Sequence, residues 1–315
     1  MTIQIRRVYP LIRLTTAVAL MTLGCSAMWA GAIVLEPIAN EFDTGRGNSS
    51  LIYGTFMIGF ALGGVVMGRL ADRMGIMIPA LIGSLALPAG FYLAAHASSI
   101  LEISLAFSLL CGFLGSSFSM APLIADISHW FNRRRGLAVG IAFSGSYVAG
   151  AIWPPILQRM FDAQGWRESF IDLALITLIF MALLSLILYP KPTVNKHLPN
   201  AGSANSNLTK SSISAGTLQG LICLAGFGCC VAMAMPQIHI VPYVMDLGHP
   251  AIRGAEMLGL MLGFGVISRV SSGWLSDRIG GLQTLLLGST LQLIVLIAFF
   301  AGNSLIFLYG ISIAF

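Results

Sequence analysis

GRLADRMG at residues 68–75 and GWLSDRIG at residues 273–280 are two copies of one pattern, about 205 residues apart. Glycine, leucine, aspartate, arginine and a second glycine recur at the same offsets, and Gly54 and Gly259 keep the register one helix-length upstream. A repeat at such a separation indicates a duplicated fold unit. Glycine permits a sharp reversal, and an aspartate and an arginine at a membrane edge can pair or cap a helix end. We therefore predict two homologous halves, each with a charged turn that closes its second helical hairpin.

The composition is typical of a helical membrane protein. The 315 residues are 57% hydrophobic and only 9% charged, and the mean hydropathy is +0.86, whereas about a quarter of a soluble domain is charged. Its apolar runs exceed the roughly 20 residues that cross a bilayer as a helix and the roughly ten of a barrel strand. We therefore expect an all-α polytopic membrane protein. The net charge of +5 is ascribed to membrane orientation and not to nucleic-acid binding.

Nine apolar runs are long enough to span a bilayer, and a tenth begins near the end of the chain. The predicted spans are about Leu11–Leu35, Leu51–Met67, Ile76–Ala95, Leu101–Ile124, Gly136–Leu157, Phe170–Tyr189, Ile213–Val241, Glu256–Leu275 and Leu282–Ala301, with a partial one from Ser304 to Phe315. Loops are predicted at Glu36–Ser49 and Gln158–Ser169, and Asp126–Arg135 is the most basic cluster. Pro154-Pro155 is predicted to kink or end the fifth helix.

The halves are separated by a stretch rich in proline, asparagine and serine, which is typical of a linker. We predict a six-helix N-terminal half at residues 1–189, a cytoplasmic linker at 190–212 and an incomplete C-terminal half at 213–315. The first run is too long for a signal peptide and lacks a cleavage site, which predicts a retained span.

The distribution of basic residues predicts a cytoplasmic N-terminus. That orientation places about twelve of them inside and four outside, in agreement with the positive-inside rule. The inner ones are Arg6, Arg7, Arg13, Arg69, Arg73, Arg133, Arg134, Arg135, Lys191, Lys196, Lys210 and Arg278, and the outer ones are Arg46, Arg159, Arg167 and Arg253. The expected location is the cell membrane, as a multi-pass protein of a bacterial inner membrane.

The duplicated turn resembles a known signature. G-x-L-x-D-R-x-G after the second helix, repeated after the eighth, is similar to the loop signature of the major facilitator superfamily. The resemblance implies two pseudo-symmetric six-helix halves. It also implies gating or loop-signature roles for Gly68, Asp72, Arg73, Gly75, Gly273, Asp277, Arg278 and Gly280. Because members of this superfamily have twelve spans, the resemblance further implies a chain that lacks its last helices.

Arg269 is the one basic residue that this count assigns to neither side, and it lies inside the eighth predicted span. It precedes Asp277 by two helical turns, which places it about 12 Å from the inner edge of the membrane. A cation at that depth is costly and by default marks a substrate or ion path, and its planar donors suit a carboxylate. The alternative is an arginine that snorkels to the headgroups or pairs within the bundle.

A second, narrower resemblance supports the carboxylate interpretation. WFNRRRGLAVGIAFSGS at residues 130–146 is similar to the entry of the fifth helix in the monocarboxylate transporters and the oxalate:formate antiporter group. Ile267-Ser268-Arg269, followed by GWLSD at 273–277, is similar to their eighth helix, where an arginine four residues before the glycine binds the substrate carboxylate. Arg269 matches that position.

The chain also departs from these families. Many monocarboxylate transporters have an aspartate four residues before the arginine, where this chain has Gly265. Proton coupling through such a pair is therefore left open. The fourth-helix arginine of sugar and drug members is missing near Gly112, which argues against a proton-coupled sugar or drug antiporter.

Weaker candidates complete the predicted site. Ser268, Gln237, Tyr147 and Trp29 could line a substrate cavity, although aromatic residues in spans are more often packing or interface residues. His239 is a candidate proton site, because histidine is the side chain suited to exchange protons at physiological pH, with a plain interfacial histidine as the alternative.

The predicted function is secondary active transport of small organic anions, monocarboxylates or related carboxylates, by alternating access. The expected partners are such an anion, the lipid bilayer and H⁺ as a candidate coupling ion, for a monomer without nucleic acid. The alternative is a non-transporting membrane protein, a sensor or the remnant of a truncated gene. No catalytic residue, metal ligand or cofactor is predicted, because the sequence has no nucleophile–base pattern, metal cluster or phosphate loop.

Overall fold

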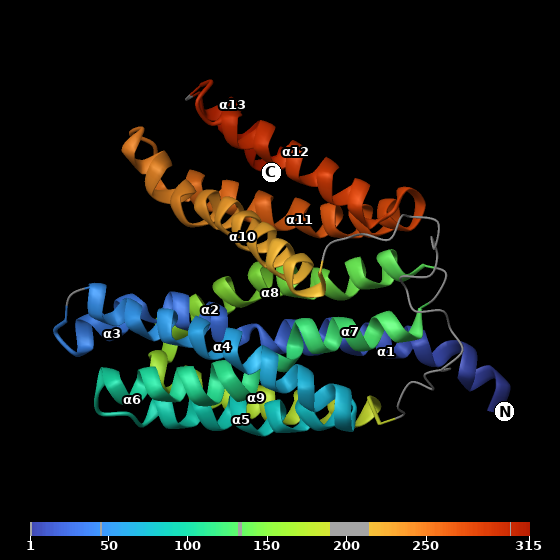
Figure 1. The fold of residues 1–315 in the computed structure, drawn as a ribbon. Helices are drawn as coiled ribbons and strands as arrows, with labels where there is room; N and C mark the ends of the chain where they lie inside the picture. Colours follow the sequence, from blue (N-terminus) through green and yellow to red (C-terminus); the bar gives the residue numbers. More distant parts are fainter. Residues whose placement is uncertain (1, 45, 132–133, 190–213, 303) are drawn as a thin grey trace. The chain divides into compact units, whose positions relative to one another are not determined.

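The computed structural model describes residues 2–44, 46–131, 134–189, 214–302 and 304–315, and Figure 1 shows their arrangement. Within these ranges nine helices are long and apolar enough to cross a membrane, and Leu305–Ala314 is a shorter apolar helix. The described residues contain helices and no strand. The predicted all-α polytopic fold, with nine full spans and part of a tenth, is therefore confirmed.

The helices follow the chain in a simple order. The first six spans contain α1 (Thr2–Gly24), α2 (Ser26–Ile33), α3 (Leu35–Glu41), α4 (Arg46–Met74), α5 (Met77–Ala95), α6 (Ile100–Leu105), the π-helix η1 (Ala106–Ser116), the 3₁₀ turn η2 (Ser117–Ser119), α7 (Ala121–Trp130), α8 (Arg135–Gln164) and α9 (Trp166–Ile187). The remaining helices are α10 (Ala215–Asp246), α11 (Ala251–Ile279), α12 (Gly281–Ala298) and α13 (Leu305–Ala314).

The chain forms two compact units. The first contains Met1–Pro192 together with Val266–Arg278, and the second contains Thr193–Gly265 and Ile279–Phe315. The second half of α11 thus belongs to the first unit. The predicted domain limits at 189 and 213 stay a prediction, and the predicted linker at 190–212 lies outside the described residues.

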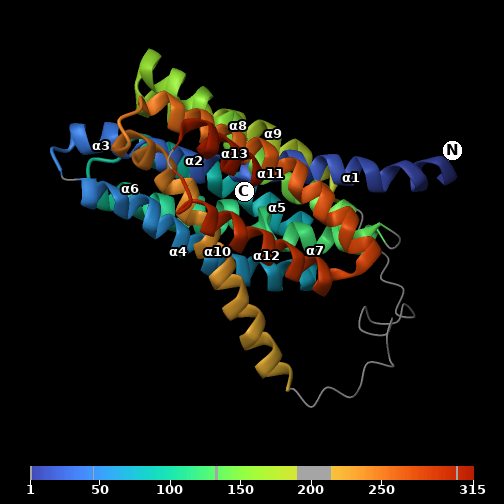
Figure 2. The same ribbon diagram turned by 90° about the horizontal axis from the view of Figure 1, so that it is seen from above.

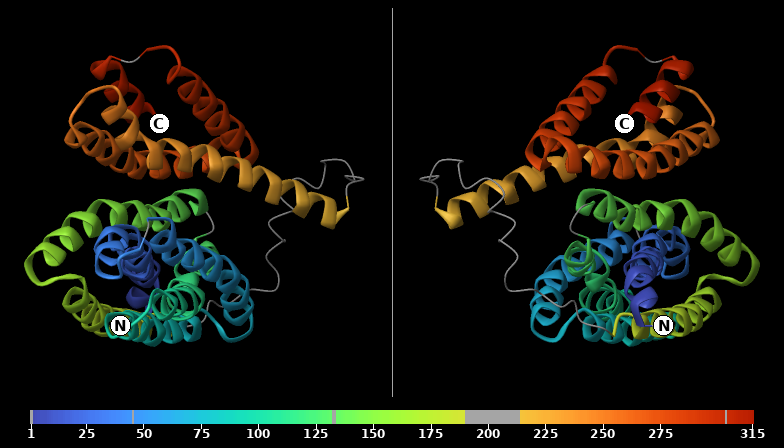
Figure 3. Two further views of the ribbon diagram at one scale, coloured as in Figure 1. Left: turned by 90° about the vertical axis from the view of Figure 1, so that its left-hand side faces the viewer. Right: turned by 90° about the vertical axis from the view of Figure 1, so that its right-hand side faces the viewer.

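The core of the first unit is a continuous apolar cluster around α1, α5, η1 and α9. Figure 3 shows α1 and α2 (blue) running beside the other helices of this unit. Phe107 of η1 packs on Phe91 of α5 and Phe170 of α9, with ring centroids 6.2 and 5.7 Å away. Gly59 and Gly63 of α4 lie directly against backbone carbonyls of η1, where a side chain would collide. Small residues that allow close backbone approach are the usual means of packing helices in a membrane.

The predicted loops are wrong in extent at two places. The stretch Glu36–Ser49 contains most of α3 and the first residues of α4, and Gln158–Ser169 contains the end of α8 and the start of α9. The basic cluster that starts at Asp126 begins within α7, which continues to Trp130. The prediction that Pro154-Pro155 could end the helix is also wrong. α8 continues to Gln164, and it ends at Gly165, whose φ is 84°. Proline is tolerated inside membrane helices because neighbouring groups satisfy the carbonyls that it frees.

Arg13, which the sequence count placed on the inner side, is buried inside the first unit; its predicted side of the membrane stays a prediction. Its side chain is 0% exposed, and its Nε and Nη2 donate to the two carboxylate oxygens of Asp126 at 2.7 and 2.9 Å. Nη1 donates to the Tyr9 hydroxyl at 2.8 Å and to the Leu188 carbonyl at 3.3 Å. The guanidinium also lies 4.8 Å from the ring of Trp130. Because Arg13 falls within the candidate span Tyr9–Ile33, Arg269 is not the only arginine inside a span.

These contacts mark one end of the first unit, which we call the hinge end because the α4–α5 turn lies there too.

A second arginine holds the opposite end of α9. Arg167 donates to Glu41 of α3 at 2.7 and 3.0 Å and to the carbonyls of Ala95 and Ala97 after α5 at 2.6 and 3.0 Å. Trp166 donates to the other Glu41 oxygen at 2.6 Å. Charge-assisted bonds to carboxylates and to helix C-termini are the strong type.

The second unit has a small core, formed by Ile240, Val244, Met257, Met261 and Leu308. The hydroxyl of Tyr309 in α13 donates to Glu256 of α11, which also pairs with Arg253 at 3.2 Å. The first half of α10 is exposed along its described residues, and Figure 2 shows it extending away from α12 and α13.

Candidate functional site

The candidate site is formed where α8 meets residues 266–278 of α11, both within the first unit. Glycines make this contact close. A side chain on Gly140 would collide with the Arg269 carbonyl, and side chains on Gly136 or Gly273 would each collide with the backbone of the other segment. The glycines that the sequence places at the start of the fifth span therefore bring two helix backbones together. They also bring the side chain of Arg269 against α8.

The guanidinium of Arg269 is held by two aromatic side chains of α8. It lies 4.8 Å from the ring centroid of Phe143 and 5.2 Å from that of Tyr147, and its Nη2 donates to the Tyr147 hydroxyl at 3.0 Å. Phe143 and Tyr147 are four residues apart, so they share a helix face. A cation over aromatic rings is stabilised by the ring quadrupole, more strongly where water is excluded.

This arrangement presents an oriented cation inside a candidate span, Ile252–Ile279. Arginine carries five N–H donors in a planar fork and stays charged at any physiological pH. A tyrosine hydroxyl that accepts a hydrogen bond, as Tyr147 does from Arg269, can also donate its O–H. Both groups favour a carboxylate or a similar planar anion as a ligand.

The side chain of Asp277, which belongs to α11, caps the N-terminus of α8. The residue at the N-cap position, Arg134, makes no side-chain cap. The amides of Gly136 and Leu137 instead donate to the two oxygens of Asp277 at 2.6 and 2.9 Å. These are the second and third residues of α8, the amides that a capping side chain normally accepts from. The negative charge also complements the positive end of the helix dipole.

Replacing Asp277 with asparagine is expected to expose the amides of Gly136 and Leu137. The negative charge is lost and at most one good acceptor remains, so the cap is weakened by about 1–2 kcal/mol. These two amides should then exchange hydrogen roughly 5- to 30-fold faster. Exchange mass spectrometry of peptides covering 134–140 measures this. Arg278→Gln is the control, because that side chain lies over Trp274, 3.9 Å from its ring, and not on α8. Equal protection in Asp277→Asn and wild type would contradict the cap.

The other predicted site residues are not all brought together. Ser268 is exposed beside Arg269, and Trp29 lies in α2 with a buried indole N–H that has no partner among the described residues. Gln237 and His239 belong to α10 of the second unit.

The two signature turns share their backbone geometry. Gly75 and Gly280 both have positive φ, 89° and 95°, which explains why glycine ends each copy. Asp72 and Arg73 are exposed, and no ion pair within the described residues includes them. Gly68 has open space around it, whereas Gly273 is packed on α8. The first copy therefore lacks the helix contact that the second one makes in the described part of the chain.

Sequence reasoning missed Phe143, the capped amides of α8 and the pair of Arg13 with Asp126. Phe143 could have been found, because it lies one turn before Tyr147 on the same face. Asp126 also left a signal, since it is an acid between Leu123 and Ile127 in an apolar run, and such acids are rarely unpaired. The capping role of Asp277 left no local signal, because its partners are about 140 positions away.

The nine candidate spans found among the described residues are those of a multi-pass membrane protein. The sequence profile of the Major Facilitator Superfamily matches residues 15–315, and the chain belongs to this superfamily. The predicted family is thereby confirmed.

Several relatives agree with this assignment. The chain is 27% identical over 250 residues to monocarboxylate transporter 11 of Homo sapiens, with 78% of the chain and 52% of the relative covered. It is 26% identical over 236 residues to monocarboxylate transporter 13 of Bos taurus, with coverage of 74% and 54%. The chain thus spans about half the length of these relatives. The MFS-type transporter pytF of Aspergillus terreus is 27% identical, with coverage of 70% and 72%.

A solved structure shares the fold. The crystal structure of the E. coli fucose:proton symporter FucP, determined for a single-residue variant, aligns with a TM-score of 0.59 and 18% identity, over 94% of this chain and 80% of that one. At this identity the likeness concerns the fold alone.

Proposed function

We propose that this chain is a secondary transporter of small organic anions, with monocarboxylates or related carboxylates as its substrates. The observation that carries the proposal is the Arg269 guanidinium, held between Phe143 and the Tyr147 hydroxyl within a candidate span. An oriented, partly buried cation binds a carboxylate by charge and by paired hydrogen bonds. The names of the mammalian relatives, monocarboxylate transporters, point to the same substrate class.

Arg269 is the proposed carboxylate ligand, and Tyr147 is proposed to orient the guanidinium and to donate its own O–H to the anion. Phe143 keeps water from one face of the guanidinium and so strengthens its attraction for a negative charge. Trp29, Ser268 and Gln237 are proposed to line the remaining cavity, and His239 is proposed as a proton site if H⁺ is the coupling ion.

Alternating access is proposed to use the two predicted halves, 1–189 and 213–315, as the moving bodies. The contact of Asp277 with the amides of α8 would close the cytoplasmic side, and it would have to break for that side to open. The turn with Asp72 and Arg73 is proposed to play the matching role in the other half. This model places the N-terminus and the hinge end in the cytoplasm, in agreement with the positive-inside count.

Uptake by reconstituted vesicles tests the proposal. The full chain in proteoliposomes is expected to take up labelled formate, lactate, pyruvate or oxalate with saturation, and unlabelled carboxylates should compete. Empty liposomes and labelled fucose serve as controls, the sugar because a neutral solute gains nothing from Arg269. Saturable sugar uptake without carboxylate uptake would overturn the assignment.

A further inference from the structure

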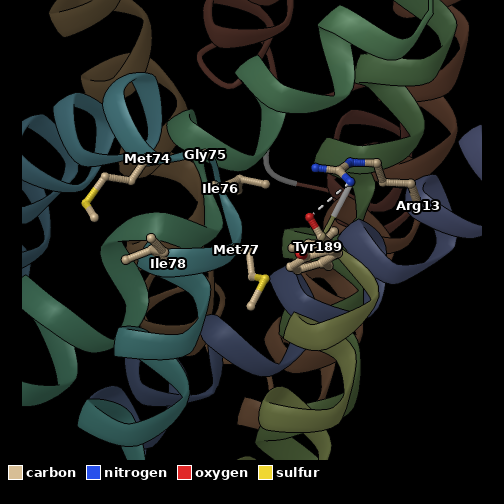
Figure 4. A pocket seen from close by; sticks show the side chains of 8 residues that line it. Arg13, Met74, Gly75, Ile76, Met77, Ile78 and Tyr189 are labelled. Carbon is tan, nitrogen blue, oxygen red and sulfur yellow. Dashed lines mark hydrogen bonds between the residues drawn. The ribbon is translucent and has the colours of Figure 1, made fainter. Parts of the chain in front are cut away.

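A cavity lies at the hinge end of the first unit, apart from the Arg269 site. It has a volume of about 200 Å³ and is lined by the turn from Met74 to Ile78, by Leu188 and Tyr189 after α9, and by Arg13. Figure 4 shows these side chains around the opening, with Arg13 bonded to the Leu188 carbonyl. Gly75, whose φ of 89° reverses the chain, makes this wall possible.

The cavity is suited to hydrocarbon and not to a free ion. Methionine, isoleucine and leucine side chains supply most of its lining, and methionines adapt to irregular apolar shapes. Arg13 contributes a wall with little net charge, because both oxygens of Asp126 bind its guanidinium and the side chain is 0% exposed. A small anion that entered the cavity would therefore have to displace Asp126.

The position of the cavity is at headgroup depth. Three candidate spans begin or end there, Ser50–Met74, Met77–Ala95 and Trp166–Ile187. Tyr189 is 74% exposed beside the opening, and exposed tyrosine is typical of the membrane–water interface.

Two cations precede the lining turn in the chain: Arg73 directly precedes Met74, and Arg69 lies one helical turn earlier in α4. Arg69 and Arg73 are exposed on the last turns of α4, and their spacing of four residues puts them on one face. Asp72 is the opposing charge of the same turn, and it leaves a net charge of +1 for the three residues. In the described part of the chain, no salt bridge uses either arginine. An apolar cavity beside exposed cations complements an amphiphile with an anionic head.

We propose that this cavity is a binding site for an anionic phospholipid. One acyl chain enters between the Met74–Ile78 turn and Tyr189, and the phosphate pairs with Arg69 and Arg73. The bound chain packs against the Met74–Ile78 turn and Tyr189, so the lipid stabilises the hinge end of the first unit.

Native mass spectrometry of the purified, delipidated full chain tests the site. With phosphatidylglycerol added, wild type is expected to retain one lipid at concentrations where phosphatidylcholine is not retained. The variant Arg69→Gln/Arg73→Gln is expected to bind phosphatidylglycerol about 10- to 30-fold more weakly, from about 5-fold for each cation near a membrane surface. Met77→Trp fills the cavity and should remove retention of the lipid.

Two matched controls separate this site from general contact with lipid. Arg159→Gln removes an exposed arginine on α8, and Leu93→Trp adds the same ring to an exposed position of α5; both should bind like wild type. Equal retention of phosphatidylcholine, or unchanged phosphatidylglycerol binding in Met77→Trp, would overturn the proposal. Since the readout is lipid binding, the result is independent of whether the chain transports carboxylates.

Discussion

Arg269→Gln is expected to lower carboxylate uptake by about 100-fold or more. Glutamine keeps a donor but loses the charge, and two hydrogen bonds to a charged group are worth about 3 kcal/mol together, or about a factor of 100 in binding. The measurement is the initial rate of labelled carboxylate uptake in proteoliposomes, normalised to reconstituted protein.

Arg269→Lys separates charge from geometry. Lysine keeps the charge but loses the planar fork and the stacking on Phe143 and Tyr147. An intermediate loss of about 10-fold is expected, seen mainly as a higher KM because the ligand is held less well. Arg159→Gln on α8 is the control for removing a positive charge, and it should transport like wild type. Uptake at the wild-type rate in Arg269→Gln would exclude this residue as the carboxylate ligand.

Single replacement of Arg13 or Asp126 is expected to produce the largest loss of stability in the chain. Arg13→Met leaves the carboxylate of Asp126 buried at 7% exposure without its cation, and Asp126→Leu leaves the fully buried guanidinium without its anion. Removing one partner of a buried pair costs about 3–5 kcal/mol. Thermal unfolding in detergent, followed by tryptophan fluorescence, measures the loss.

The double variant Arg13→Met/Asp126→Leu decides whether the pair itself is needed. Apolar side chains of similar volume often replace a buried pair without loss, so the double variant should recover most of the stability. Arg253→Met is the control, because its partner Glu256 forms a pair at 48% and 44% exposure, and exposed pairs contribute about 0–1 kcal/mol. Single variants as stable as wild type would contradict a structural role for the pair.

The sequence predicted well the features that depend on residues close together in the chain. Run length predicted the spans. The repeated pattern predicted a charged turn in each half, and Gly75 and Gly280 have positive φ in equivalent places. Tyr147 contacts Arg269, and its predicted place in a substrate cavity stays a prediction. The helix ends were predicted less well, because proline and single charges break helices in water more readily than in a membrane bundle.

The contacts that the sequence did not predict join residues far apart in the chain. Nothing near Arg13 in the sequence indicates Asp126, which lies 113 positions away, so Arg13 was counted only as an inner-side charge and its partner was not predicted. The cap on α8 was missed for the same reason. In both cases a charged residue is satisfied by a distant helix, and its environment depends on tertiary packing.

The attachment of α9 at both of its ends has a mechanical consequence. Arg167 fastens its beginning to α3 and to the end of α5, while Arg13 and the Tyr9 hydroxyl hold the last carbonyls, those of Leu188 and Ile187. Because α9 is bound at both ends, it can neither slide along its axis nor rotate about it without breaking several charged contacts. Spin labels on α5 and α9 should therefore keep one separation throughout the proposed transport cycle.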